Sequence, residues 1–231
     1  MKKNKMMRLA SILLIAVLMS TCVISGTFAK YTDSKSETDS ARVAKWGVQI
    51  ALNADEAFAN EYTSDVASNP APDVDAEVKG TSEAVVIAPG TKGTLATASI
   101  SGTTEVAVQV TKTAGLELTG AWVADGAYYC PISIKVTING TPTTFNGMDY
   151  NSIDEFVAAV NGAITADAKF APNANIGYEI TVEWAWAIEG GAGQTNAKDT
   201  ILGAAATEGD INISFSLAVG VDQIDTYTPA P

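Results

Sequence analysis

Carboxylates clearly outnumber the basic side chains in this sequence, and histidine is absent. The 231 residues contain 26 Asp and Glu, 14 Lys and Arg, and no His. Without an imidazole, neither the usual zinc sites nor the Ser-His-Asp and Cys-His nucleophilic arrangements can be built. A carboxylate pair or a Ser-Lys pair could still act, but no spacing in the sequence selects one. We therefore expect a protein that is not an enzyme and needs no cofactor.

Calcium is the one metal that the sequence brings into consideration. Asp73, Asp75 and Glu77 place three carboxylates at alternate positions of one segment. The segment lacks the glycine and the distal glutamate of an EF-hand loop. We interpret it as a solvated acidic loop, with calcium binding as the alternative.

Two groups of aromatic residues invite a sugar-binding interpretation. Trp184 and Trp186 stand two residues apart, on the same strand face as Val182 and Ile188, so we expect them in the core. The segment Trp122–Tyr129, with Tyr128 and Tyr129 beside an Asp-Gly turn, is the better candidate for an exposed contact.

The first 29 residues have the order of an export signal. Lys2, Lys3, Lys5 and Arg8 precede an apolar run over 9–24, and small residues follow over 25–29. The apolar run is short and interrupted for a membrane anchor, and an acylated Cys22 is a weaker alternative. We predict cleavage after Ala29, with Thr27 and Ala29 as the recognised small residues and Lys30 as the first mature residue.

Removal of the signal makes the protein still more acidic. The signal takes four of the 14 basic residues and none of the acidic ones from a chain whose formal charge is already −12. Nucleic acid and, after cleavage, an anionic membrane are therefore poor partners. Cys22 also leaves, so Cys130 has no intrachain partner, and we expect it to be a small buried hydrophobic residue.

Alternation of apolar and polar residues dominates the remaining sequence and predicts strands. The clearest runs are 44–52, 106–110, 132–138 and 211–219, and weaker ones are 84–88, 94–100, 116–123 and 178–188. Turn signals separate them at Pro89-Gly90, Asp125-Gly126 and Asn139-Gly140. The pattern predicts an all-β fold: a two-sheet antiparallel sandwich of jelly-roll type with about eight strands.

One or two short helices should accompany the strands. Ser152 and Glu155 form a capping box before an apolar stripe that Asn161-Gly162 should end. A second helix is expected over 200–206, capped by Asp199. We predict one sandwich domain over 44–225 with a polar loop insertion at 53–83, preceded by an N-terminal extension over 30–43 and followed by a short tail over 226–231.

The signal junction resembles a known family. Gly26-Thr27-Phe28-Ala29-Lys30-Tyr31-Thr32-Asp33, followed by the strand 45–50, is similar to the junction of the TasA/CalY/camelysin family of bacterial biofilm-matrix and cell-surface proteins. A looser similarity covers 85–93 and the strand with Glu105-Val106. The sequence departs from the family pattern at Tyr31 and over 40–45, as a divergent member would. The metalloendopeptidase activity described for camelysins is not carried over, because no His is present.

The resemblance implies processing by a SipW-type signal peptidase and a jelly-roll subunit that polymerises by donor-strand complementation. The donor would be the extension 30–43, with Tyr31, Thr32, Asp33, Ala41 and Val43 as candidate donor residues. The alternative is that 30–43 is a flexible linker.

Two functions follow as expectations. The first is a secreted structural protein of the bacterial cell surface or biofilm matrix, a fibre subunit that self-associates or binds other matrix proteins. The alternative is a monomeric secreted adhesin or binding module that uses the loop 53–83 or the segment 122–129.

Overall fold

The computed structural model describes residues 42–54, 57–63, 77–81, 85–188, 193–206 and 210–228. The chain divides after Val43, and the unit Ala44–Pro231 contains every element described below. Several residues singled out from the sequence lie outside the described part, so the predictions made for them stay predictions: Thr27, Ala29, Lys30, Tyr31, Thr32, Asp33, Ala41, Asp73 and Asp75.

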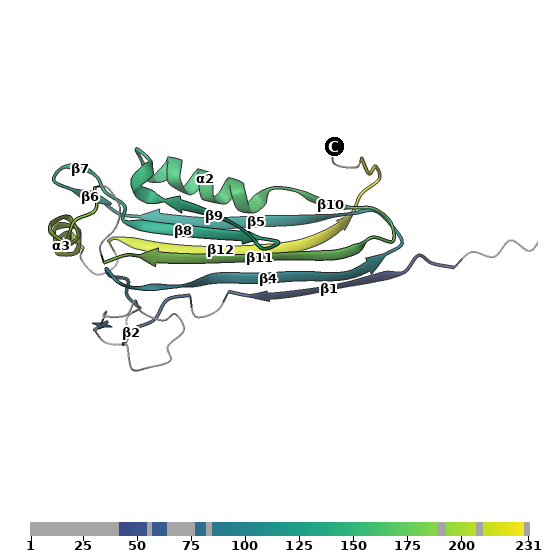
Figure 1. Cartoon of the computed structure of the whole chain (residues 1–231), viewed down its shortest axis with the longest axis horizontal. Coiled ribbons are helices and arrows are strands. Elements are labelled where there is room, and N and C mark those ends of the chain that lie inside the picture. Colours follow the sequence, from purple (N-terminus) through teal and green to yellow (C-terminus); the bar gives the residue numbers. More distant parts are fainter. Residues whose placement is uncertain are drawn as a thin grey trace, which may run out of the picture. The chain divides into compact units, whose positions relative to one another are not determined.

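Two antiparallel sheets form the sandwich (Figure 1). The five-stranded sheet has the order β1 (Trp46–Asn53), β4 (Lys92–Thr104), β11 (Asn175–Trp186), β8 (Ile132–Ile138) and β9 (Thr141–Asn146). The three-stranded sheet has the order β10 (Ala168–Phe170), β5 (Val108–Thr119) and β12 (Asn212–Gln223). Two small hairpins pair β2 (Glu61–Tyr62) with β3 (Val78–Lys79) and β6 (Val123–Ala124) with β7 (Ala127–Tyr128). The predicted all-β sandwich of about eight strands is confirmed.

Period-two patterning places the core between the two sheets. Along β11 every second side chain is buried, and the buried set ends with Trp184 and Trp186, as predicted. Trp184 also anchors the described part of the segment 53–83. Its indole Nε1 donates to the carbonyl of Ala57 at 2.8 Å, and the buried Tyr62 ring meets it edge-on. The segment predicted as a polar loop therefore contributes β2 and a core aromatic.

The strand order is that of a jelly roll except for one strand, β1, which pairs with a different neighbour. In an eight-stranded jelly roll the first strand pairs with the last, and the second pairs with the seventh. Here β4 and β11, the second and seventh strands of the two main sheets, are paired. The first strand, β1, pairs with β4 instead of with the last strand, β12. This change of neighbour leaves five strands in one sheet and three in the other.

Two strand predictions were wrong in their boundaries. The runs 106–110 and 116–123 belong to a single strand, β5, which begins at Val108 and ends at Thr119. Of the run 84–88, the described residues 85–88 form only an isolated bridge, between Ala59 and Val86. The Asp125-Gly126 and Asn139-Gly140 turns are confirmed: all four residues have positive φ, which Asn, Asp and Gly tolerate best.

The helices differ from prediction at their ends. Helix α2 (Ile153–Thr165) begins where expected, with the Ser152 Oγ accepting from the Glu155 amide at 3.3 Å. It continues past Asn161-Gly162, because its apolar stripe runs on to the buried Ile164. Helix α3 (Asn196–Ala205) is capped by Thr195, and Asp199 lies in its first turn. A 3₁₀ turn, η1 (Gly147–Asp149), completes the set, and none of the described helices has the length and hydropathy needed to cross a membrane.

Candidate functional site: the open side of the sandwich

One side of the sandwich is closed by a helix. The second layer contains α2 beside β5, and α2 also approaches β8 and β9 of the first layer (Figure 1). Asn161 reaches from α2 to the edge of β5: its Oδ1 accepts from the Leu116 amide at 3.0 Å and its Nδ2 donates to the Leu116 carbonyl at 3.3 Å. The side chain thus replaces a neighbouring strand. Beyond the reach of α2, β10 pairs with the first part of β5.

Two further features protect the closed side. The edge strand β9 has only six residues and contains Pro142, which cannot donate to another strand. Lys112, on the inner face of β5, donates to the carbonyl of Ala166 at the end of α2 and to the Tyr178 hydroxyl at 2.6 Å. A cation at a helix C-terminus is favourable, although burial lowers the pKa of this lysine. On the closed side, therefore, the strand edges are protected against pairing with another chain.

The opposite side, which we call the open side, consists of the outer edges of β1 and β12. Strand β1 pairs only with β4, and β12 pairs only with β5, among the residues that the structure describes. The two strands approach each other across the layers. Each therefore presents an edge along which another strand could add main-chain hydrogen bonds.

β1 lacks the usual protection of an exposed edge. Its sequence, WGVQIALN, contains no charged residue and no proline. Edge strands usually carry such residues to prevent pairing with other chains. The side chains of Trp46, Ile50 and Leu52 lie on the inner face of the sheet, since Ile50 is opposite the buried Ile100. They remain 51%, 45% and 46% exposed, because the second layer does not cover them.

β12 is equally unprotected over most of its length. Its 12 residues include no lysine, arginine or proline, and the only charged one is Asp222 near its end. Its inner face carries apolar side chains, of which only Leu217 is buried and the others are partly exposed: Ile213, Phe215, Val219 and Val221. Its outward residues are small. Both edges of the open side are thus long, nearly uncharged and lined by incompletely buried apolar groups.

Two glycines hold β1 against β4 and so set the position of the open side. Gly102 has a φ of +121°, and a Cβ there would collide with the carbonyl of Gly47. A Cβ at Gly47 would in turn lie 2.9 Å from the Thr103 carbonyl oxygen. At the start of β1, the amide of Lys45 donates to the Glu105 carboxylate at 2.8 Å. The sequence therefore has glycine at two positions, 47 and 102, where β1 and β4 approach each other closely.

Only one of the predicted donor residues can be placed. Val43 lies three residues before β1, and its side chain is 92% exposed. The alternation over 44–52 predicted the strand but did not reveal that its apolar face stays half exposed. The absence of charge and proline from 46–53 was the available sign of an unprotected edge.

The aromatic residues predicted to make exposed contacts do not do so. Trp122 and Tyr129 are buried, and Tyr128 is half-buried. The Trp122 indole donates to the Thr119 carbonyl at 3.0 Å, and the Tyr128 hydroxyl donates to the Gly147 carbonyl at 3.0 Å. The two buried rings flank the β6–β7 hairpin, and the Tyr129 amide donates to the Trp122 carbonyl at 2.8 Å. This segment offers no aromatic platform for a ligand.

Asp199 is the one buried carboxylate among the residues that the structure describes. It is 6% exposed and accepts hydrogen bonds from the Tyr129 hydroxyl at 2.5 Å, the Trp186 indole at 3.3 Å and the Gln194 amide at 3.4 Å. Burial and the bond to Asp199 raise the pKa of Tyr129 above its ordinary value. The donors hold α3 against the sheet and leave no nucleophile or proton acceptor exposed. The cluster is structural.

Cys130 is fully buried and unpaired, as predicted. Burial raises the pKa of its thiol to about 11, which opposes thiolate chemistry at neutral pH. No group of three metal-ligating side chains occurs among the described residues. Glu77 is described, but Asp73 and Asp75 are not, so calcium binding in that segment stays a prediction.

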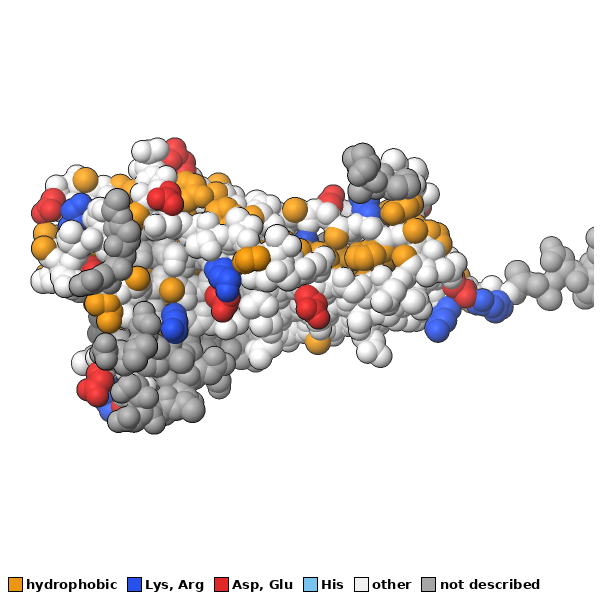
Figure 2. Space-filling model, viewed as in Figure 1, with side chains coloured by type: hydrophobic (Ala, Val, Ile, Leu, Met, Phe, Trp, Pro, Cys, Tyr) orange, Lys and Arg blue, Asp and Glu red, His pale blue; other side chains and the backbone are white. Residues whose placement is uncertain are grey.

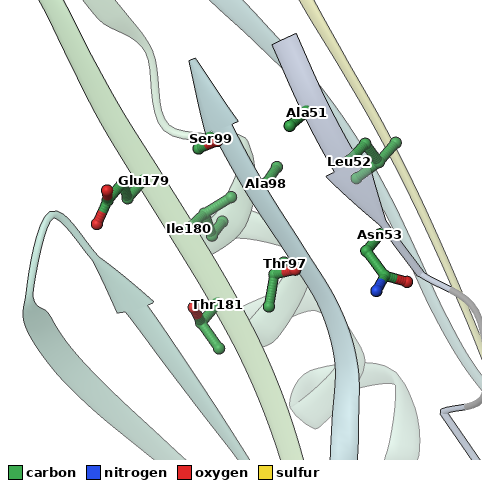
Figure 3. A pocket seen from close by; sticks show the side chains of 9 residues that line it. All are labelled: Ala51, Leu52, Asn53, Thr97, Ala98, Ser99, Glu179, Ile180 and Thr181. Carbon is green, nitrogen blue, oxygen red and sulfur yellow. The ribbon is translucent and has the colours of Figure 1, made fainter. Parts of the chain in front are cut away.

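A shallow depression of about 260 Å³ lies on the outer face of the five-stranded sheet (Figure 3). Two rows of side chains cross β1, β4 and β11 there: Ala51, Ser99 and Glu179, and next to them Asn53, Thr97 and Thr181. The depression exists because Ala51 and Ser99 are small. No aromatic side chain lines it. Figure 2 shows one face of the molecule on which charged groups are few, and most of the surface that is not grey belongs to the backbone or to side chains that are neither charged nor hydrophobic.

The geometry defines the described unit as an antiparallel β-sandwich with one protected and one unprotected side. Comparison of the chain with models of protein families, with curated proteins and with solved structures found no match in any of the three.

Proposed function

We propose that this protein is an exported structural protein of a bacterial cell surface or biofilm matrix, and that it assembles into fibres. In the proposed assembly, the extension 30–43 of one copy adds a strand to the open side of the next. The observation that carries the proposal is the contrast between the two sides of the sandwich. Asn161 and Pro142 protect one side, whereas β1 and β12 present long edges with almost no charge and no proline.

Addition of a strand would change both features of the open side, its unpaired strand edges and its half-exposed apolar side chains. Main-chain groups along the edge would gain hydrogen-bond partners, and the half-exposed apolar side chains would be covered. A contact between the extension of one copy and the edge of another is head-to-tail. Such a contact does not close on itself, so it generates a filament.

The charge of the extension favours this role. Residues 30–43 carry three basic and three acidic side chains, so the segment is formally neutral: Lys30, Lys35 and Arg42 against Asp33, Glu37 and Asp39. The acidic excess of the mature chain lies in the rest of it. A neutral segment approaches an acidic copy without the repulsion that two sandwich domains would experience.

Signal cleavage would control assembly. The predicted cleavage site after Ala29 directly precedes the extension, and a SipW-type signal peptidase is the processing enzyme that the family resemblance suggests. Before cleavage, the hydrophobic signal holds the start of the extension at the membrane. After cleavage, the extension is free to reach another copy.

One observation favours a second function, a monomeric binding module. The depression lined by Asn53, Thr97 and Glu179 offers hydroxyl, amide and carboxylate groups to a small polar ligand. It is shallow and lacks aromatic side chains, whereas small-molecule sites are usually enclosed and mostly apolar. The buried state of Trp122 and Tyr129 argues against the segment 122–129 as the binding surface of such a module, and most of the loop 53–83 lies outside the described residues.

Deletion of the extension tests the proposed function. Mature protein beginning at Lys30 should form polymers on ageing, seen by size-exclusion chromatography and negative-stain electron microscopy. A variant that begins at Val43 should remain monomeric. A third variant, with 30–42 replaced by a Gly-Ser segment of equal length, should also remain monomeric, because it keeps the length but not the strand-forming pattern. Fibres of unchanged length and number in the two variants would disprove the donor role, and a persistent monomer of the intact mature protein would favour the binding module.

A further inference from the structure

We propose that the acceptor on the open side is the outer edge of β12, and that it receives residues 30–43 of a second copy in the antiparallel direction. The chain's own extension cannot take this place in that direction. The inference rests on the proposed function and specifies which edge, which direction and which copy take part.

The topology shows that a neighbouring strand is missing beside β12 among the described residues. In a jelly roll the first strand occupies the edge beside the last strand. Here β1 has moved to β4, in the other sheet, and no described strand occupies the place beside β12. The three-stranded sheet is therefore one strand short at this edge. A strand added here would fill the empty position. A strand added to β1 would instead give a sixth strand to the sheet that already has more strands.

Coverage of apolar surface points to the same edge. Trp46, Ile50 and Leu52 of β1 face the second layer and stay about half exposed. A strand beside β12 would extend the second layer over β1 and would cover these side chains. A strand on the outer edge of β1 would lie in the plane of the first layer and leave them uncovered. Burial of apolar surface thus favours β12 as the acceptor.

Strand direction excludes the chain's own extension. Trp46, at the start of β1, is opposite Thr104, the last residue of β4. Residues 105–107 join β4 to Val108, which is opposite Gln223 at the end of β12. The extension therefore enters the domain at the end where β12 finishes. If it folded back along its own β12, it would run parallel to that strand, which is the less stable pairing and not the one that the first jelly-roll strand makes.

A second copy stacked beyond that end avoids the problem. Its β12 begins at the near end, so an extension that reaches into it from the first copy runs antiparallel to β12. β12 has 12 residues, which the extension 30–43 can span in full. The result is a filament in which every copy points the same way (Figure 1 gives the direction of β1 and β12 in one copy).

The sequence of the extension has the pattern of such a strand. Over 32–40 the even positions are all Ser or Thr and the odd positions are all charged. In an extended segment these sets lie on opposite faces. The small uncharged face, from Thr32 to Ser40, would then point inward, over β1. The charged face would point to solvent.

A self-capped variant tests the acceptor. In the mature chain, residues 225–231 are replaced by Asn-Gly and a second copy of residues 30–43. Ile224, whose amide donates to the Ala107 carbonyl, is kept. An Asn-Gly turn reverses the chain as a tight hairpin, so the added copy runs antiparallel to its own β12. The control carries the same 14 added residues in an order that breaks the alternation of charged and hydroxyl side chains.

We expect the self-capped variant to remain monomeric while the mature chain and the control polymerise. Its melting temperature should exceed that of the control by about 5 °C, because the added strand binds only the folded state. Polymerisation and melting equal to those of the control would overturn the assignment to β12 and leave the proposed function intact. If the mature chain does not polymerise, the melting temperatures decide alone: a higher value for the self-capped variant supports the edge assignment although the proposed function fails, and equal values overturn both.

Discussion

The amide of Asn161 on α2 forms two hydrogen bonds with the main chain of Leu116 on β5, one to the N–H at 3.0 Å and one to the carbonyl at 3.3 Å. A single side chain therefore satisfies both groups that a neighbouring strand residue would satisfy. The open side has no equivalent contact among the described residues. This difference divides the molecule into an edge that excludes other chains and an edge that can accept one.

Replacement of Asn161 should destabilise the domain and weaken the closed side. Asn161→Ala leaves the amide and carbonyl of Leu116 without partners, and we expect the free energy of unfolding to fall by about 2 kcal/mol. Asn161→Asp keeps the acceptor for the Leu116 amide but places a carboxylate oxygen against the Leu116 carbonyl, so its loss should be at least as large. Urea denaturation of both variants measures the difference. Unchanged stability in Asn161→Ala would show that α2 covers the edge without this contact.

Gly102 should tolerate no side chain, whereas Gly177 on the adjacent strand should tolerate one. Gly102 has a φ of +121°, and a Cβ there meets the main chain of Gly47, but a Cβ at Gly177 meets nothing within 4 Å. We expect Gly102→Ala to lower the free energy of unfolding by about 2 kcal/mol or more and to increase amide exchange in β1. Gly177→Ala should be neutral or slightly stabilising. Equal effects of the two changes in thermal unfolding would refute the role assigned to Gly102.

Asp199 should contribute strongly to stability. Asp199→Ala removes the acceptor of the Tyr129 hydroxyl, the Trp186 indole and the Gln194 amide, and we expect a loss of about 3 kcal/mol. Asp154→Ala, in the exposed first turn of α2, is the matched control and should lose less than about 1 kcal/mol. Chemical denaturation separates the two. A loss in Asp199→Ala as small as in the control would mean that the cluster does not hold α3.

Cys130 should make stability depend on pH in the alkaline range. Burial raises the pKa of its thiol from 9.0 to about 11, so the folded state favours the neutral thiol. The stability due to this preference is complete below pH 9 and is lost as the pH rises toward 11. Relative to Cys130→Ala, the native protein should therefore lose stability over this interval. Comparison of the two proteins cancels the contribution of Lys112, whose pKa burial lowers, while Tyr128, whose pKa is raised by burial and by its neighbour Cys130, titrates together with the thiol and contributes in the same direction. A constant difference between them from pH 8 to 11 would contradict the buried position.

The sequence predicted correctly those strands in which apolar and polar residues alternate without interruption. The run 132–138 became β8 without change, because its alternation is complete and an Asn-Gly turn follows it. Trp184 and Trp186 were placed in the core from their shared strand face. The end of α2 was missed, since Asn161 looked like a helix terminator but its side chain binds Leu116 in the folded protein.

The open side could not be predicted, because it depends on contacts between distant segments. The pairing of β1 with β4 rather than with β12 brings Gly47 and Gly102 close together, and no local pattern reveals that contact. The same limit applies to Trp122 and Tyr129. Their position beside a turn suggested exposure, whereas their burial depends on Thr119 and on Asp199, which lies 70 residues from Tyr129.

Hydrogen–deuterium exchange on β12, compared between monomer and polymer of the mature protein, tests the central claim most directly. If the open side accepts a strand at β12, outward main-chain amides within Asn212–Gln223 should exchange at least tenfold more slowly in the polymer, while amides of β9 on the closed side stay unchanged. Slower exchange in β9 or α2 with no change in β12, or the absence of any polymer, would contradict the account.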